Sequence, residues 1–309
     1  MVIVKLIGGL GNQMFQYAAG QSLAQKHNTT LKLDDSGFHQ YPNRSYSLNH
    51  LGIREEFATP NELFCYTGKP QTKTQEFLCH FAELWKRFCR EIPCLKLPSF
   101  FTLPPLSPKV YSEPHFHFDT NFFQLPADVY LDGYWQSEKY FKDIEKTIRQ
   151  EFAVKIPITG QNLEITSAIN RTESVSLHIR RGDYVNNEKT NAVHGTCGLE
   201  YYLACIKQAS QTVSNAHFFA FSDDPRWMME NLRIDHPLTY VVHNNISEAH
   251  EDLRLMSLCR HNIVANSSFS WWAAWLNKNP DKIVFAPQEW FKKEGVNTKD
   301  LIPPDWKKI

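Results

Sequence analysis

Residues 174–184 read SVSLHIRRGDY, and the rest of the chain is organised around this stretch. Its first six residues form a short β-branched run that is typical of a buried strand. Arg180 and Arg181 then follow where a strand of an open α/β sheet would give way to a loop, and that edge of such sheets binds ligands. Because arginine offers a planar fork of donors, the pair suits a diphosphate. The alternative is a solvated turn whose arginines pair with Asp183 and neighbouring acids.

The composition indicates an ordinary globular protein and excludes some classes. A length of 309 residues suits two α/β domains. Lys plus Arg equals Asp plus Glu at 33 each, so the net charge does not favour binding to nucleic acid or to an acidic membrane. Seven cysteines without CxxC spacing favour reduced thiols over zinc or disulfides. Without a signal peptide or an apolar run of about 18 residues, we expect a cytoplasmic protein with no transmembrane segment. Peripheral membrane contact and the oligomeric state stay open.

The first half opens with a strand–helix–strand unit whose helix follows a glycine loop, GGLG at 8–11. The expected elements are a strand at 2–7, a helix at about 13–27, a strand at 30–34, a helix at 74–90, a strand at 128–135 and a helix at about 137–151. Prolines between 93 and 114 predict a loop or short extended pieces.

A nicotinamide-dependent oxidoreductase is one alternative for this unit. A dinucleotide fingerprint would need glycine where Met14 stands, with Asp34 or Asp35 as the ribose acid, so the match is poor. The glycines still indicate that something approaches the backbone closely, and Asn12 supplies a polar head at the helix start.

Strands and helices alternate regularly in the second half, which predicts a parallel sheet with right-handed crossovers. The expected strands are 174–179, 216–221, 239–243, 261–265 and 282–285, and the expected helices are 199–213, 226–232, 248–260 and one ending at 277. We therefore predict an α/β fold with two Rossmann-like domains facing across a cleft. Their bounds are 1–152 and 153–289, with 153–172 as a weakly structured linker. The segment 290–309 is predicted to pack back on the first domain.

Two more strand ends in the second half carry polar clusters. In Ser222-Asp223-Asp224 the carboxylates can accept from the guanine edge or from ribose hydroxyls. Asn266-Ser267-Ser268 opens a helix, where free N–H groups and the helix dipole favour phosphate. Each acid or serine could instead be a plain N-cap. Taken together with the arginines, the clusters predict a nucleoside-diphosphate site.

These residues carry a resemblance to a known family. Residues 178–184 (HIRRGDY) resemble the HxRRxD motif shared by α1,2- and α1,6-fucosyltransferases. Residues 8–17 (GGLGNQMFQY), 221–224 (FSDD) and the run 252–272 resemble the other signatures of α1,2-fucosyltransferases, glycosyltransferase family 11. The resemblance extends from residue 3 to about residue 276 with the motifs in the same order.

The resemblance implies a GT-B fold and an inverting transfer of L-fucose from GDP-fucose to the 2-hydroxyl of a terminal β-galactoside. It implies no metal or other cofactor, so arginines and a helix N-terminus must stabilise the departing GDP. The product would be a bacterial glycan such as a surface polysaccharide precursor. Residues 36–135 would recognise the galactose-terminated acceptor. An α1,6-fucosyltransferase is the nearest alternative. A non-catalytic glycan-binding module would use Tyr134-Trp135 and Trp271-Trp272, although the second pair is more simply a buried helix face.

The family pattern assigns roles to residues of this chain. Arg180 would contact the β-phosphate, Arg181 would support the loop or pair with an acid, and His178 and Asp224 would contact guanosine. The residues expected at the donor are His178, Arg180, Arg181, Asp223, Asp224, Asn266, Ser267, Ser268, Gly9 and Gly11.

Inversion calls for a base that takes the proton of the acceptor hydroxyl. The candidates are Asp183 and Glu188, which stands ten residues after His178, the spacing of the proposed base in α1,6-fucosyltransferases. Pairing with Arg181 would make Asp183 a poor base, and leaving-group stabilisation could dominate instead. The catalytic candidates are Arg180, Asp183, Glu188 and Asn12, the last facing the cleft near the reacting sugar or acting only as a helix cap.

Overall fold

The computed structural model describes residues 1–40, 44–91 and 109–309, so most of the predicted proline-rich loop lies outside the described residues. Its first sheet is parallel, with strand order β2-β1-β4-β3. The strands are β1 (Val2–Lys5), β2 (Leu31–Asp34), β3 (Val110–Ser112) and β4 (Val129–Asp132). The opening strand–helix–strand unit is therefore present as predicted.

The second sheet is also parallel, with strand order β10-β9-β8-β5-β6-β7. The strands are β5 (Glu173–Ile179), β6 (Ala216–Ser222), β7 (Leu238–Val241), β8 (His261–Ile263), β9 (Val284–Ala286) and β10 (Lys307–Lys308). Two parallel α/β halves confirm the predicted fold class. The predicted domain boundaries remain a prediction.

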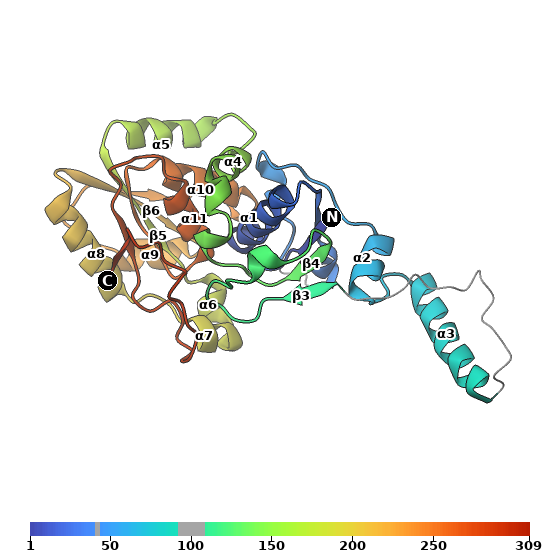
Figure 1. Ribbon diagram of the computed structural model, residues 1–309. Coiled ribbons are helices and arrows are strands. Elements are labelled where there is room, and N and C mark those ends of the chain that lie inside the picture. Colours follow the sequence, from blue (N-terminus) through green and yellow to red (C-terminus); the bar gives the residue numbers. More distant parts are fainter. Residues whose placement is uncertain (41–43, 92–108) are drawn as a thin grey trace.

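Helices join and cover the strands (Figure 1). They are α1 (Leu10–Lys26), α2 (Pro60–Thr67), α3 (Lys73–Glu91), α4 (Glu145–Glu151), α5 (Gly160–Asn170), α6 (Gly182–Asn186), α7 (Glu188–His194), α8 (Leu199–Thr212), α9 (Pro225–Asn231), α10 (Ala249–Leu258) and α11 (Ser268–Leu276). Figure 1 shows α1 and α11 in the middle of the molecule, with α3 extending away from the body.

The two halves share one hydrophobic core, because α1 and α11 pack against each other. Phe15 of α1 contacts Trp271 and Trp272, with ring centroids 4.5 and 4.8 Å apart. The Trp272 indole N–H donates to the carbonyl of Gly11 at 3.0 Å. Both tryptophans are fully buried, which confirms the buried-face interpretation and removes them as a sugar-stacking surface.

Lys282 caps the far end of α11. Its Nζ donates to the carbonyls of Ala274 and Asn277 at 2.8 and 3.0 Å, which would otherwise be unpaired at the helix C-terminus. Burial lowers the pKa of Lys282 to about 8. The cation complements the negative end of the helix dipole, and the positive end of α11 is left facing α1.

Two segments differ from the sequence predictions. The weakly structured linker predicted at 153–172 contains helix α5 instead, because a short polar helix leaves little apolar periodicity to detect. The predicted helix at 137–151 is reduced to α4 preceded by two short 3₁₀ turns. The C-terminal segment contacts the first half through Asp300, and it ends as strand β10 of the second sheet.

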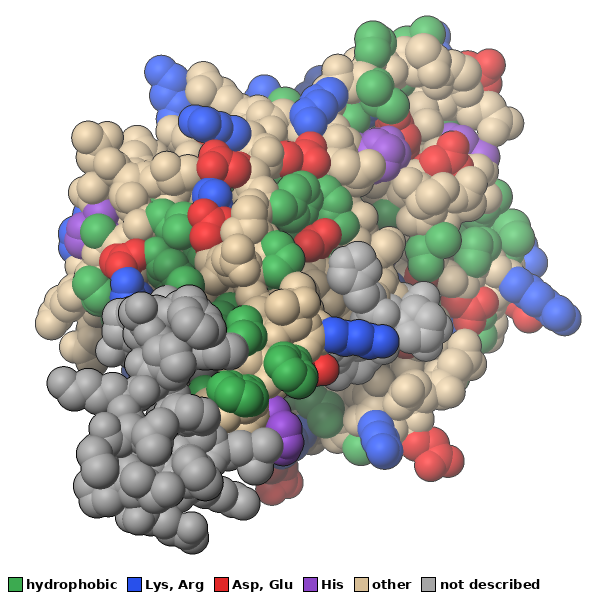
Figure 2. Space-filling model, turned by 90° about the vertical axis from the view of Figure 1, so that its right-hand side faces the viewer, with side chains coloured by type: hydrophobic (Ala, Val, Ile, Leu, Met, Phe, Trp, Pro, Cys, Tyr) green, Lys and Arg blue, Asp and Glu red, His purple; other side chains and the backbone are tan. Residues whose placement is uncertain are grey.

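The surface is electrically mixed. Figure 2 shows basic and acidic side chains interspersed over the coloured part of the face near α3, in keeping with the net charge of zero. Within the described ranges, no helix is both long and apolar enough to cross a membrane.

Candidate active site

The side chain of Arg180 lies at the carboxyl end of β5 between two carboxylates. Nη1 donates to Asp223 Oδ2 at 2.8 Å, and Nη2 donates to Asp183 Oδ1 at 2.5 Å. Its Nε is buried and has no hydrogen-bond partner among residues 1–40, 44–91 and 109–309. A partly exposed guanidinium with an unused donor is equipped to bind a further anion.

Arg181 points away from Arg180, as expected for consecutive residues at the end of a strand. Its backbone N–H donates to Asp223 Oδ1 at 2.8 Å, and its Nε donates to Asp224 Oδ2 at 3.3 Å. The guanidinium also lies 3.9 Å from the centre of the Trp227 ring. The predicted pairing of Arg181 with an acid is confirmed, and these contacts hold the loop.

The two acids after β6 are therefore engaged with the arginine loop. Asp224 is also the N-cap of α9, accepting from the Trp227 N–H at 3.1 Å. A Cβ at Gly182 would lie 2.3 Å from Asp223 Oδ2, so only glycine allows this close approach. Both carboxylates fix the loop geometry, and their contact with guanosine stays a prediction.

Asp183 has partners that the sequence did not indicate. The expected pairing with Arg181 is wrong, because Asp183 bridges Arg180 and Arg44 through its two oxygens. Arg181 is turned to the opposite side of the loop. Arg44 comes from the first half of the chain, so this ion pair joins the two halves.

His178 is buried next to α11. Burial, reinforced by the Arg180 charge, lowers the pKa of its imidazole to about 3, so the ring is neutral. The ring lies 5.4 Å from that of Phe269. Its Nδ1 is buried and has no hydrogen-bond partner in the described part of the chain, and a ligand group could satisfy this nitrogen.

The two residues before α11 have different structural roles. Asn266 is buried and donates to the carbonyls of His194, Gly195 and Trp290 at 3.0–3.3 Å, which fixes neighbouring loops. Ser267 is the N-cap, accepting from the Phe269 N–H. Their phosphate contacts remain predictions.

Ser268 opens α11 and meets the start of α1. Its Oγ donates to Asn12 Oδ1 at 2.6 Å, and Gln136 Nε2 donates to the same oxygen at 2.9 Å. A Cβ at Gly11 would lie 2.5 Å from the backbone of Ser268 and Phe269. The glycine therefore allows both helix N-termini to converge, and its donor contact stays a prediction. Gly9 lies close to Arg44, since a Cβ there would be 3.5 Å from Nη1.

Glu188 lies outside this ion-pair network. It starts α7, and its side chain is exposed without a partner among the residues that the structure describes. Its position two residues after α6 still places it in the α6–α7 segment that follows Arg180.

A fourth polar cluster follows β7, and the sequence analysis missed it. Asn244 donates to Asp252 Oδ1 at 2.7 Å and exchanges hydrogen bonds with Asn162. Burial, together with the nearby charges of Glu248 and Glu251, raises the pKa of Asp252 to about 7. A His-Asn pair at 243–244, at the end of a predicted strand, was the signal that could have revealed it.

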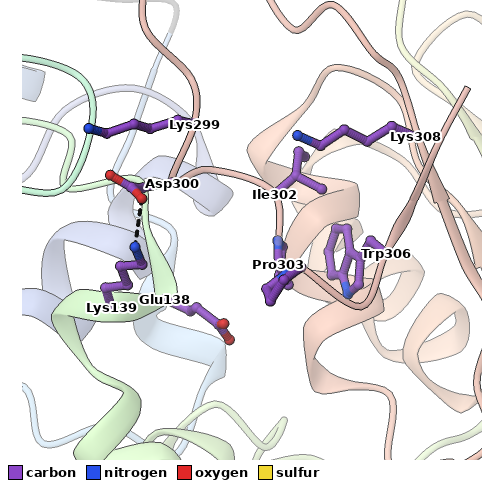
Figure 3. A pocket seen from close by; sticks show the side chains of 9 residues that line it. Glu138, Lys139, Lys299, Asp300, Ile302, Pro303, Trp306 and Lys308 are labelled. Carbon is purple, nitrogen blue, oxygen red and sulfur yellow. Dashed lines mark hydrogen bonds and ion pairs between the residues drawn. The ribbon is translucent and has the colours of Figure 1, made fainter.

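Other possible sites are limited. Across 1–40, 44–91 and 109–309, no group of three His, Cys, Asp or Glu side chains could hold a metal ion. A cavity of about 490 Å³ lies between residues 138–139 and the C-terminal segment, where Figure 3 shows Lys139 directed at Asp300. None of the predicted site residues lines this cavity, so we assign the chemistry to the strand ends.

The fold and site define an α/β protein whose second parallel sheet collects cations and a helix N-terminus at its carboxyl edge, an arrangement suited to binding the phosphates of a nucleotide. The model of glycosyl transferase family 11 matches residues 93–309. The chain belongs to this family, and it is a glycosyltransferase.

Curated relatives agree with this assignment. An α-1,2-colitosyltransferase from Escherichia coli is 34% identical over 100% of this chain and 99% of its own length. The O-antigen biosynthesis glycosyltransferase WbnK from Escherichia coli is 32% identical over 97% and 98%. A galactoside 2-α-L-fucosyltransferase from Caenorhabditis elegans is 28% identical over 58% and 52%. Among solved structures, fucosyltransferase NodZ from Bradyrhizobium matches with a TM-score of 0.47 and 14% identity, covering 88% and 91%.

Proposed function

We propose that the protein transfers L-fucose from GDP-fucose to the 2-hydroxyl of a terminal β-galactoside, with inversion at the anomeric carbon. One observation carries the proposal: Arg180 is joined through Asp183 and Arg44 to the glycine loop at the start of α1, where the N-terminus of α11 also lies. This convergence supplies fixed positive charge for a diphosphate leaving group. The acceptor is proposed to be a galactose-terminated oligosaccharide, and the location cytoplasmic.

The reaction would be driven mainly by the leaving group. As the bond between fucose carbon 1 and the β-phosphate oxygen breaks, negative charge grows on GDP, and Arg180 can stabilise it through its unused Nε. The acceptor oxygen forms the new bond from the opposite face and loses its proton. Both oxygens of Asp183 are already in ion pairs, so Glu188 is the better candidate to accept that proton.

We propose that Asp252 recognises guanine. Both oxygens of Asp223 are engaged by the arginine loop, and those of Asp224 by Arg181 and by the Trp227 N–H of α9. Asp252 Oδ2, by contrast, has no partner among the described residues. Helix α10, which carries Asp252, packs against α11 and β5, the elements that surround His178. A carboxylate can accept from both N1–H and the N2 amino group of guanine.

Replacing Asp252 with asparagine should weaken GDP binding by about 10- to 100-fold, because one of the two acceptors becomes a donor. Isothermal titration with GDP and with ADP measures the effect, which should be confined to GDP. Asp281→Asn, an exposed position, is the control. Equal GDP affinity in the Asp252 variant and the parent would exclude this role.

The first test of the donor site is thermal stabilisation by GDP, compared with UDP, ADP and NAD, with and without magnesium. A hundredfold excess of ligand over Kd should stabilise the folded state by about 2.7 kcal/mol. We expect a shift with GDP alone that does not depend on magnesium. Absence of a GDP shift would refute the proposed donor, and a shift that needs magnesium would refute the proposed metal independence.

A second donor is favoured by one comparison, the full-length similarity to an α-1,2-colitosyltransferase. Colitose is fucose without its 3-hydroxyl, so GDP-colitose has the same diphosphate and nucleoside. Initial rates with GDP-fucose and GDP-colitose at equal concentrations distinguish the two. A higher kcat/KM for GDP-colitose would change the proposed sugar and leave the proposed site as it is.

A further inference from the structure

The turn that follows β4 has a strained backbone next to the candidate site. Trp135 has a φ of +57°, in the left-handed region that non-glycine residues seldom adopt. Its side chain is fully buried against Phe122 and Tyr140. Such a conformation persists only when its surroundings enforce it, and it is often found at functional sites.

Glu113 is the residue that enforces this conformation. It follows β3 directly, and its N–H donates to the Asp132 carbonyl at 2.9 Å, which places it beside the end of β4. Its carboxylate accepts from the Tyr134 N–H at 2.7 Å and from the Trp135 N–H at 3.0 Å. Each oxygen of one carboxylate therefore fixes one amide of the turn.

This turn positions the side chain of Gln136 next to Asn12. The buried Gln136 donates from Nε2 to Asn12 Oδ1 at 2.9 Å, and Ser268 donates to the same oxygen at 2.6 Å. Two donors on Oδ1 define the orientation of the Asn12 amide. Its Nδ2 lies over Gly8, where a Cβ would be only 2.5 Å away, and it has no acceptor among the described residues.

We propose that Glu113 and Gln136 are positioning residues, which hold Asn12 so that its Nδ2 donates a hydrogen bond to an oxygen of the bound nucleotide sugar. This inference rests on the proposed function. It gives Asn12 the role of a hydrogen-bond donor at the point where both helix N-termini meet, and it excludes Asn12 as a plain helix cap.

The arrangement makes a prediction about pH. Burial raises the pKa of Glu113 to about 7, with the charge of Asp119 adding to this effect and that of His115 and the two turn amides opposing it. Tyr134 and Tyr140 are the other titratable groups close to this carboxyl. Above pH 7 the carboxylate accepts from both amides. Below it, the proton occupies one oxygen and one amide loses its partner, so turnover should fall as the pH decreases through 7.

The experiment compares Glu113→Gln and Gln136→Leu with the parent protein, measuring kcat, KM for GDP-fucose and GDP affinity from about pH 6 to 8.5. We expect kcat to fall about tenfold in both variants at pH 8, the effect of one lost hydrogen bond in the transition state, with GDP affinity retained. In Glu113→Gln the titration near pH 7 should disappear. Glu230→Gln, at an exposed surface ion pair, should match the parent.

Parental kcat in both variants, or a titration near pH 7 that survives in Glu113→Gln, would overturn the inference. If Glu113→Gln does not fold, Gln136→Leu and the pH profile of the parent decide the question. A parent that transfers no fucose would refute the proposed function instead, so the two failures are distinguishable.

Discussion

Replacing Arg180 with alanine should lower fucosyl transfer by about a hundred- to a thousandfold, the usual effect of removing one donor from a developing oxyanion. The protein should stay folded, because the acids around Arg180 keep other partners: Asp183 retains Arg44, and Asp223 retains the Arg181 N–H. Steady-state kinetics with GDP-fucose and a β-galactoside acceptor, together with thermal unfolding of the variant, measure both parts of this expectation.

The matched variants separate charge from geometry at this position. Arg180→Lys keeps one positive charge and loses the fork that engages two carboxylates, so we expect an activity between those of the parent and the alanine variant. Arg226→Ala, an exposed arginine in the neighbouring helix α9, should have parental activity. A loss of activity in Arg180→Ala of less than about tenfold would show that leaving-group stabilisation lies elsewhere.

Local patterns in the sequence were sufficient for most of the second half. Short apolar runs, β-branched in β5 and aromatic in β6, predicted these two strands, and the polar residues at their ends were found at one edge of one sheet. This succeeded because parallel strands align their carboxyl ends, so a cluster after each strand needs no knowledge of tertiary contacts. The alternation of side chains along a strand likewise explains why Arg181 and Arg180 point in different directions.

Residues whose partners are distant in sequence could not be predicted. Arg44 reaches Asp183 across 139 positions, and it comes from a segment without periodicity. Gln136 reaches Asn12 across 124 positions through a turn with a left-handed tryptophan, a conformation that the sequence does not signal. Strand β10 consists of two lysines, and only its register with β9 makes it a strand.

The sequence predicted the glycine loop, but the reason given for its glycines was partly wrong. Its glycines were interpreted as leaving room for a ligand at the backbone, by analogy with dinucleotide-binding loops. In the structure, Gly11 leaves room for another helix of the same chain, the N-terminus of α11. The acid expected for a nicotinamide ribose, Asp34, is buried and accepts from the Tyr130 hydroxyl at 2.5 Å.

Replacing Gly11 with alanine should destabilise the protein by about 3 kcal/mol or more, the upper range for an added methyl group in a packed core. In an unconstrained helix the same change would stabilise by about 0.5–1 kcal/mol, so the sign itself is informative. The reason is that the new Cβ would lie 2.5 Å from backbone atoms of Ser268 and Phe269, which cannot rotate away as a side chain would. Differential scanning fluorimetry and denaturant unfolding measure the change.

Gly9→Ala is the matched control, two residues earlier in the same loop. Gly9 has a φ of −82°, which alanine adopts freely, and its Cβ would be 3.5 Å from Arg44, an ordinary contact. We expect its stability to stay within about 1 kcal/mol of the parent. Equal stability of the two variants would mean that α1 and α11 can move apart without loss. In that case Asn12 and Ser268 would not be held together by the fold, and convergence of the two helix N-termini would no longer support a diphosphate site.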